Sequence, residues 1–451
     1  MLMKFSSILF IYVILPLIVA IYYIIPKKHK EKALFGISLF FIFTFGFSIL
    51  TTVCIFVLPN YLLCRLIGRA VKKKWLCMSL FVFDFALNVA YGIFCKHFIM
   101  NDIVFFEDFS GQLTFIGTVF LVMSAIGIAD EVRQGEVAEK NFIKFGLYIV
   151  YFPKFIAGPY ISYKSFSENL SEAEKGLEVL GNGASAFVKG LAKKVIIADS
   201  IFQLWHSVNM LDISSISVLT AWLGILAFGL SFYFTLSGIT DMARGISLIF
   251  GINLPKSFRY PIFSTSMTEF CDHWHMSLTQ WLKMYIYRPT EKFSYNRIIN
   301  AVKLILMWCC VGIMYEYTLN KLIWGLIIAL SLIVEKILSK RYFGKMSSFL
   351  YAFLATNIGW IFFMEDNPIN SLKFLKAVTG GTGNIADITG VYFLRSYALI
   401  LLIGIYFSTD LFKNLIERSR GRKHIETAVS IMSPFVLTAL LAVSTVLITY
   451  N

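Results

Sequence analysis

The chain has 451 residues, of which 57% are hydrophobic and only 15% charged, and its mean hydropathy is +0.71. Soluble proteins carry about 25% charged residues, so this composition excludes a soluble globular protein and predicts an all-α, polytopic integral membrane protein. The net charge of +14 does not indicate a nucleic-acid partner. Its Lys and Arg residues lie in short loops between apolar runs, where such residues orient membrane spans and contact anionic headgroups. The expected partner is the lipid bilayer.

The first third of the chain predicts five membrane spans, because its apolar runs approach the roughly 20 residues that cross a bilayer. We expect the first run to be retained as a helix, since no small-residue cleavage site follows it. The basic loops at 26–32 and 68–74 indicate the cytoplasmic side, which leaves the N-terminus outside. The predicted spans are 5–25, two within 33–67, 75–95 and 115–128.

Residues 145–212 depart from this pattern. The aromatic run YFPKFIAGP at 151–159 contains two prolines and does not predict an ordinary span. Residues 184–205 alternate lysines with apolar side chains, which is typical of an interfacial or re-entrant amphipathic helix. Irregular backbone at membrane depth persists only inside protein or beside a water-filled cavity. The sequence therefore predicts a central funnel.

Two apolar segments within 217–250 lead into the stretch that concentrates polar groups. Ser266 and Glu269 form a Ser-x-x-Glu pattern that caps a helix start, and Pro289 predicts where that helix stops. One face of this single predicted helix carries Trp274, Leu278, Trp281 and Tyr285.

His275 projects from another flank of the same predicted helix. A titratable imidazole among aromatic side chains in a membrane protein indicates a functional group. The simpler alternative is a packing histidine with a backbone partner. His273, two residues earlier, is most simply paired with Glu269 at i−4.

The last third predicts further spans and one long loop, 365–391, so that the total is eleven or twelve spans around the funnel. We expect a single membrane domain, 1–451, in three sections: N-terminal helices 5–145, a core 146–331, and C-terminal helices 332–451. The predicted late spans are 299–314, 322–337, 349–363, 392–407 and 428–450.

Seven cysteines show no C-x-x-C spacing, and most fall in or beside apolar runs. Buried thiols that behave as small apolar groups explain them better than disulfides or metal ligands. The sequence contains no zinc motif, and we expect no metal site.

An ordered set of motifs spans most of the chain and resembles the membrane-bound O-acyltransferase family. The resemblance is closest to the bacterial branch that includes alginate O-acetylation proteins and proteins that transfer D-alanyl groups toward teichoic acids. The motifs are YFPKFIAGP at 151–159, GLAKKVIIAD at 190–199, SGITDMA at 237–243, Tyr260-Pro261, WHMSLTQW at 274–281 followed by Tyr285 and Tyr287, and GWIFF at 359–363.

The resemblance implies a funnel-shaped protein of the bacterial cell membrane that moves an acyl group toward a hydroxyl of a cell-surface polysaccharide, and it favours acetyl as that group. The implied co-substrate is a cytoplasmic thioester such as acetyl-CoA or an acyl carrier protein, with no tightly bound cofactor. An extracytoplasmic acyltransferase is the implied protein partner. Histidine suits the general base, because its pKa lies near operating pH.

Two histidine motifs characterise the family. The first, Trp-His-x-Ser-Leu, is present at 274–278 and assigns His275 as the retained catalytic histidine. The second, Gly-Leu-Trp-His-Gly, corresponds to Gly312–Glu316, so that Tyr315 stands at the usual catalytic histidine. Thr235 and Met364 also replace ionisable residues of the family pattern. The resemblance places further residues in the substrate tunnel, namely Ser237, Asp241, Trp274, Ser277 and Tyr285.

Two other functions compete with acyl transfer. The loss of the second histidine favours a catalytically degenerate relative that acts as a scaffold or regulator. Intramembrane Asp84, Asp241 and Arg244 suit a transporter of a polar solute, although Asp241 and Arg244 are spaced to neutralise each other. The transporter is disfavoured, because the sequence shows no inverted repeat.

Overall fold

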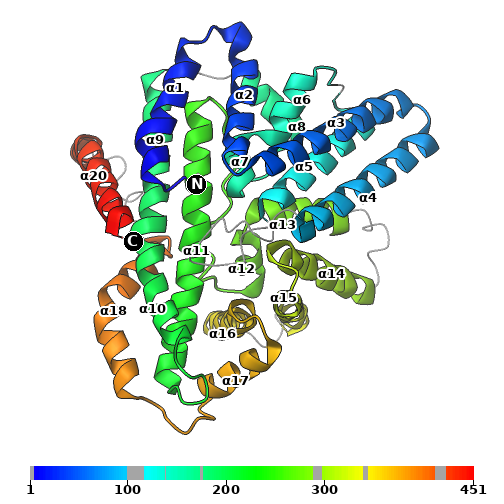
Figure 1. The fold of residues 1–451 in the computed structure, drawn as a ribbon. Coiled ribbons are helices and arrows are strands. Elements are labelled where there is room, and N and C mark those ends of the chain that lie inside the picture. Colours follow the sequence, from blue (N-terminus) through cyan, green and yellow to red (C-terminus); the bar gives the residue numbers. More distant parts are fainter. Residues whose placement is uncertain are drawn as a thin grey trace. The chain divides into compact units, whose positions relative to one another are not determined.

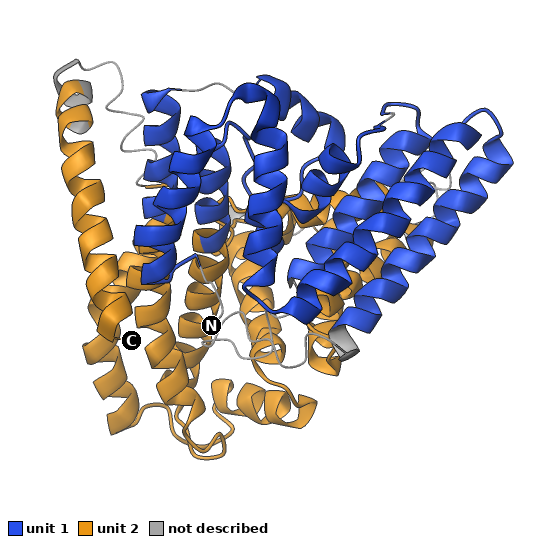
Figure 2. Ribbon diagram, turned by 45° about the horizontal axis from the view of Figure 1, so that its top comes forward, with its two compact units in different colours: residues 1–189, 239–256 blue, residues 190–238, 257–451 orange. Residues whose placement is uncertain are grey.

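The computed structural model describes residues 5–98, 116–137, 139–172, 176–287, 297–338, 344–411 and 423–450. Over these ranges the secondary structure is helical and contains no strand (Figure 1), which confirms the all-α prediction. Contacts between Cα atoms divide the chain into two compact units, coloured separately in Figure 2. Unit 1 comprises Met1–Lys189 and Ile239–Lys256, and unit 2 comprises Gly190–Gly238 and Ser257–Asn451. The single domain with three sections stays a prediction, as does the central funnel.

Unit 1 holds the N-terminal helices and the last turns of α11, and most of α9 belongs to it. Its helices are α1 Leu15–Ile24, α2 Lys30–Phe43, α3 Phe47–Ala70, α4 Lys74–Phe98, α5 Ile116–Arg133, α6 Phe142–Val150, α7 Phe152–Ala157, α8 Tyr163–Glu172 and α9 Leu177–Ala192.

Two features join distant segments of unit 1. The phenol of Tyr22 donates a hydrogen bond to the carbonyl of Phe250 at 3.0 Å. A Cβ on Gly245 would lie 2.6 Å from the carbonyl oxygen of Gly183, so that α9 and the end of α11 approach backbone to backbone. Such close approach by small residues is how membrane helices pack tightly.

The proline-containing run at 151–159 forms the six-residue α7 and not a span, as predicted. By contrast, the predicted lysine-faced helix is wrong in detail. Residues 177–209 form α9, a π-helical segment Lys193–Asp199, and α10 Ser200–Asn209. Lys194 is buried and paired with Asp199, because a buried ammonium requires a neutralising partner.

Unit 2 holds the remaining helices. They are α10 Ser200–Asn209, most of α11 Val218–Ile249, α12 Met267–His273, α13 Met276–Leu282, α14 Arg297–Tyr315, α15 Leu319–Leu338, α16 Lys345–Met364, α17 Pro368–Val378, α18 Ile388–Phe407 and α20 Lys423–Tyr450.

Two glycines fix the packing of α14 against α15. A Cβ on Gly312 would lie 2.1 Å from the carbonyl oxygen of Lys321, and one on Gly325 would lie 2.3 Å from that of Trp308. These helices therefore touch along their backbones near the C-terminal end of α14, where Tyr315 lies.

Seven helices among the described residues are long and apolar enough to cross a membrane, which confirms the polytopic class. The run at 217–250 forms one 32-residue helix, α11, and the prediction of two segments there was wrong. The predicted loop at 365–391 contains α17. The seven candidate spans are Phe47–Ala70, Lys74–Cys95, Val218–Ile249, Ile298–Tyr315, Met346–Met364, Ile388–Phe407 and Ser430–Tyr450.

Candidate active site

The stretch that carries His275 is broken where the sequence predicts one continuous helix. Helix α12 ends at His273, α13 begins at Met276, and a π-helical segment follows at Lys283–Tyr287. His275 lies between them with φ of 44°, a left-handed conformation that is rare outside glycine. The prediction of one continuous helix is therefore wrong, although Trp281 and Tyr285 still pack against each other, with ring centroids 4.4 Å apart.

Hydrogen bonds with the neighbouring segment 257–259 explain the break in the helix. The N–H of Arg259 donates to the carbonyl of His273 at 3.2 Å, and the N–H of Met276 donates to the carbonyl of Ser257 at 2.7 Å. These two hydrogen bonds occupy the His273 carbonyl and the Met276 N–H, which in a continuous helix would bond to Ser277 and Asp272. Residues 257–259 thus hold the turn that presents the imidazole.

The predicted capping box of α12 has two hydrogen bonds, one made by Ser266 and one by Glu269, and the structure confirms the one made by Ser266. The hydroxyl of Ser266 accepts a hydrogen bond from the N–H of Glu269 at 3.1 Å. The carboxylate of Glu269 accepts from the N–H of Thr265 at 2.6 Å, one residue before the position that the capping box predicts. Pro289 lies outside the described residues.

Trp274, His275 and Tyr315 meet in unit 2, although the last is 40 residues away from His275 in the sequence. The indole N–H of Trp274 donates to the phenol oxygen of Tyr315 at 3.1 Å. The rings of His275 and Tyr315 have centroids 6.3 Å apart. Phe258 lies against both Trp274 and His275, at 5.2 Å from each ring.

An aromatic cluster encloses the phenol of Tyr315. Its ring lies 5.8 Å from Phe232 on α11 and 5.3 Å from Phe363 on α16. Trp360 on α16 lies 5.1 Å from Trp274. Every one of these side chains is buried. The buried surroundings exclude bulk water, which strengthens electrostatic interactions at the site.

His275 is almost completely buried, with 1% of its surface exposed. Burial disfavours the charged form and lowers the pKa of the imidazole to about 4. The ring is therefore neutral at physiological pH. A neutral imidazole is the form that can accept a proton from a hydroxyl group, but a pKa this far below operating pH makes the buried ring a weaker base than the sequence predicted.

The other predicted tunnel residues lie in different surroundings. Ser277 is buried on α13, and the ring of Tyr285 packs 4.4 Å from that of Trp281. The hydroxyl of Ser237 on α11 accepts a hydrogen bond from the Lys193 ammonium at 3.1 Å. Asp241 belongs to unit 1, where its carboxylate lies 3.5 Å from the Arg244 guanidinium. The role of each in a tunnel stays a prediction.

Two site residues were missed by the sequence analysis. Phe232 lies in an apolar run with no motif of its own, and Phe258 precedes the Tyr260-Pro261 motif without belonging to it. Phe232 carries no signal, because an aromatic residue in an apolar run looks the same in sequence whether it contacts lipid or a site. Phe258 lies in the polar stretch 255–261, where nothing in the sequence indicates that it is packed against Trp274.

A cavity of about 500 Å³ opens on the flank of α12, α13, α14 and α15. Its lining includes the apolar side chains of Leu304, Met307 and Trp308. The charged groups at the cavity are Asp272, Lys283 and Lys336, and Lys283 is paired with Asp272 at 2.7 Å. This volume and mixed lining are typical of sites for small molecules.

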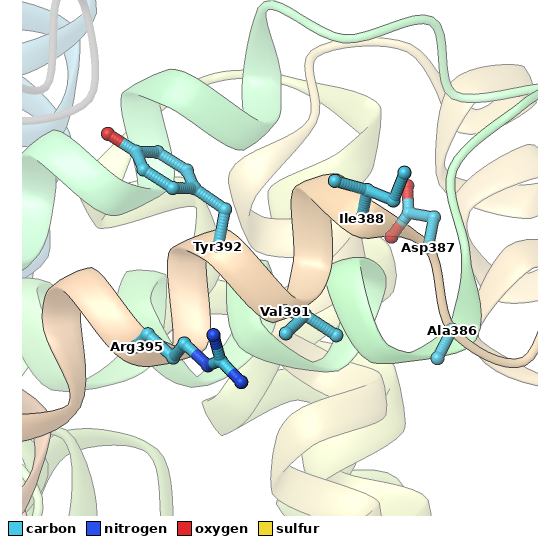
Figure 3. A pocket seen from close by; sticks show the side chains of 6 residues that line it. All are labelled: Ala386, Asp387, Ile388, Val391, Tyr392 and Arg395. Atoms are coloured by element: carbon cyan, nitrogen blue, oxygen red, sulfur yellow. The ribbon is translucent and has the colours of Figure 1, made fainter.

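A second cavity of about 500 Å³ lies at the start of α18 (Figure 3). It is lined by residues 386–388 with Val391, Tyr392 and Arg395, and includes none of the predicted site residues. The Asp387 carboxylate accepts hydrogen bonds from Ser217 at 2.6 Å and from Thr220 at 2.8 Å, and it caps α18 by accepting from Gly390 N–H at 2.9 Å. Asp387 therefore joins α18 to the start of α11, which is a structural role.

We expect Asp387→Ala to destabilise the purified protein by about 2 kcal/mol, because it removes a helix cap and the acceptor that the buried hydroxyls of Ser217 and Thr220 share. The measurement is thermal unfolding in detergent. Asp387→Asn is the matched control, since asparagine caps helices nearly as well and keeps an acceptor oxygen. Equal unfolding temperatures for Asp387→Ala and wild type would contradict the assignment.

A buried polar cluster lies where α14, α15 and α16 end or begin. The Lys321 ammonium donates to the carbonyl of Phe363 at 2.6 Å and pairs with Glu316 at 3.3 Å. The amide of Asn320 donates to the carbonyl of Glu365 at 2.5 Å. Burial, together with the nearby charge of Asp366, raises the pKa of the Glu365 carboxyl to about 7, although Lys321 opposes the shift.

Because the pKa of Glu365 is higher in the folded chain than its ordinary value of about 4.3, the folded state binds a proton more tightly. Its stabilising effect is complete below pH of about 4 and is lost as pH rises through about 7. We expect stability to fall over that window by on the order of 2 kcal/mol more in wild type than in Glu365→Gln. Thermal unfolding at several pH values checks this, and Asp366→Asn should weaken the dependence without abolishing it, because the Asp366 charge adds to the effect of burial on the Glu365 pKa.

Over the described residues, no group of three or more His, Cys, Asp or Glu side chains is placed to hold a metal ion.

The two carboxylates invoked for transport have other partners in unit 1. Asp84 accepts a hydrogen bond from Asn88 at 3.2 Å, and Asp241 pairs with Arg244.

Together the fold and the site define a multi-pass membrane protein with a buried histidine and tyrosine facing each other in an aromatic cluster. The sequence profile of the MBOAT, membrane-bound O-acyltransferase, family matches residues 71–365, more than half of the chain. The chain belongs to the membrane-bound O-acyltransferase family, as its motifs predicted.

Curated bacterial relatives support the same class. "Probable alginate O-acetylase AlgI" of Pseudomonas syringae pv. tomato is 27% identical over 380 residues, covering 81% of this chain and 73% of the relative. The peptidoglycan O-acetyltransferase of Helicobacter pylori is 30% identical over 252 residues, covering 54% and 48%. The teichoic acid D-alanyltransferase of Bacillus subtilis is 26% identical over 225 residues, covering 48% and 57%. These relatives confirm the predicted branch, the acyltransferase class and the multi-pass bacterial membrane location.

Proposed function

We propose that this protein moves an acetyl group from a cytoplasmic thioester donor toward a hydroxyl group of a cell-surface polysaccharide. The observation that carries the proposal is the meeting of His275, Trp274 and Tyr315 in one buried site. The names of the relatives favour a polysaccharide acceptor, since they include alginate and peptidoglycan O-acetylation. We further propose that an extracytoplasmic acyltransferase partner completes delivery to the polymer.

His275 is the proposed general base. Its neutral imidazole accepts the proton of the attacking hydroxyl and returns a proton to the departing thiolate. The left-handed backbone at His275 supports a functional role, because strained conformations of this kind persist only where the surrounding structure enforces them. The hydrogen bonds from residues 257–259 provide that enforcement.

The cavity between α12, α13, α14 and α15 suits the donor. Lys336, together with Lys283 once it leaves its partner Asp272, supplies positive charge for the phosphates of acetyl-CoA or of an acyl carrier protein, while the apolar lining accepts an uncharged arm. Neither donor needs to be tightly bound, since each is consumed as a co-substrate.

Reconstitution tests the proposal. The full-length protein is placed in liposomes with acetyl-labelled acetyl-CoA outside and a polysaccharide acceptor inside, with and without a candidate extracytoplasmic partner. We expect thioester consumption that depends on the protein and label that appears on the acceptor. Failure with both acetyl-CoA and a carrier-bound acetyl thioester would refute it.

A second candidate function is a scaffold that retains the fold without catalysis. One observation favours it: the phenol of Tyr315 fills the position of the family's second histidine and is held there by Trp274, Phe232 and Phe363. A scaffold predicts that the wild-type protein consumes no thioester under any of the conditions above, yet still binds its partner.

A further inference from the structure

Two serine hydroxyl groups flank the turn that carries His275. Ser277 follows His275 by two residues on α13. Ser257 is held beside the same turn, because its carbonyl accepts the N–H of Met276 at 2.7 Å, and Met276 lies between His275 and Ser277. Both serines are buried, with 2% of Ser257 and 4% of Ser277 exposed.

Neither hydroxyl has a hydrogen-bond partner in the described part of the chain. Elsewhere in unit 2, Ser231 donates to the carbonyl of Phe228 at 3.0 Å and Ser264 to that of Pro261 at 2.8 Å, whereas the buried hydroxyl of Ser444 on α20 also has no partner. An unpaired buried hydroxyl costs roughly 1–3 kcal/mol of desolvation. Two such groups at the His275 turn therefore require an explanation, and a bound acceptor oxygen supplies one.

Acyl transfer generates such an oxygen. The carbonyl oxygen of a thioester gains negative charge in the transition state, and hydrogen-bond donors held in place beforehand stabilise it. A base alone leaves that charge unsolvated in a buried aromatic site. Ser257 and Ser277 supply buried O–H donors from the two segments that meet at the His275 turn.

We propose that the hydroxyl groups of Ser257 and Ser277 form the oxyanion site for the thioester carbonyl, an inference that rests on the proposed acyl transfer. The imidazole of His275 removes the proton of the acceptor hydroxyl, whose oxygen forms a bond to the carbonyl carbon. The carbonyl π electrons move to oxygen, where the two serines donate hydrogen bonds. The C=O bond then re-forms, the C–S bond breaks, and the thiolate takes the proton from the imidazolium.

Serine substitutions with a matched control test this inference in the reconstituted full-length protein. Ser257→Ala and Ser277→Ala are each expected to lower kcat about 10²-fold with little change in the donor KM, the effect of removing one oxyanion donor. Ser264→Ala is the control, since its buried hydroxyl is already bonded to its own backbone, and it should retain wild-type kcat. Ser277→Thr, which keeps a hydroxyl group, should recover part of the rate.

A vibrational measurement separates this role from a structural one. Acetyl-CoA labelled with ¹³C at the carbonyl is bound to the His275→Asn variant, which lacks the base. We expect the carbonyl stretch to shift to lower wavenumber on binding, and the shift to shrink when Ser257 or Ser277 is also changed to Ala.

Wild-type kcat in both serine variants, an equal loss in Ser264→Ala, or an unchanged carbonyl band would each overturn the inference while leaving the proposed function intact. If wild type consumes no acetyl thioester from any donor, the proposed function fails and the oxyanion site fails with it.

Discussion

His275→Ala is expected to reduce thioester consumption by about 10³-fold, the typical contribution of a general base. The kcat should fall, while the KM for the donor should change little, because the imidazole contacts the reacting hydroxyl and not the proposed donor cavity. Initial rates of thiol release from acetyl-CoA, in detergent and in liposomes, provide the measurement.

Two further variants make the result interpretable. His275→Asn tolerates the left-handed backbone and keeps a polar side chain, but it has no nitrogen that titrates, so it should fold normally and remain inactive. His273→Ala is the matched control, because His273 lies two residues away, beside Glu269 at 3.9 Å. It should retain activity within about twofold. Equal rates in wild type and His275→Asn would remove His275 from the mechanism.

The sequence predicted the class of fold well, because the hydropathy of a helix depends directly on whether lipid or water surrounds it. Its errors lie where length was the only guide. The apolar run at 217–250 exceeds the roughly 20 residues of one span, which favoured two segments. The run forms the single helix α11. Glycines within it, such as Gly229 and Gly238, allow close contact with neighbouring helices and do not break α11. A Cβ at Gly229 would lie 3.1 Å from the Trp360 ring, and one at Gly238 would lie 2.7 Å from the Gly190 carbonyl.

The site shows a second limit. Motif order was sufficient to pair position 275 with position 315, and the structure places these rings 6.3 Å apart. The break at Trp274–His275 was not predictable, because helical periodicity continues through it. Only the hydrogen bonds that Arg259 N–H donates and the Ser257 carbonyl accepts, from 14 or more residues earlier in the chain, show why the backbone leaves the helix there. The unpaired hydroxyls of Ser257 and Ser277 depend on that break and were equally invisible.

Tyr315→His is expected to raise acyl transfer about 10²-fold if position 315 limits the rate. A phenol, with an ordinary pKa of about 10, does not accept a proton at neutral pH, whereas an imidazole does. Histidine is smaller than tyrosine, and its ring nitrogen can accept the hydrogen bond that the indole of Trp274 now gives to the phenol. The measurement is the rate of label transfer from acetyl-CoA in liposomes that contain wild type or Tyr315→His.

Tyr315→Phe separates the phenol from the space that the ring fills. If the phenol only holds Trp274, this variant keeps the wild-type rate and loses stability, because the buried indole N–H is left without its acceptor. If Tyr315 itself donates to a reacting oxygen, both Tyr315→Phe and Tyr315→His lose rate, and the phenol is a working replacement for the family's histidine. A gain in Tyr315→His alone identifies the wild-type site as one that retains the fold and His275 but lacks its second proton-transfer group.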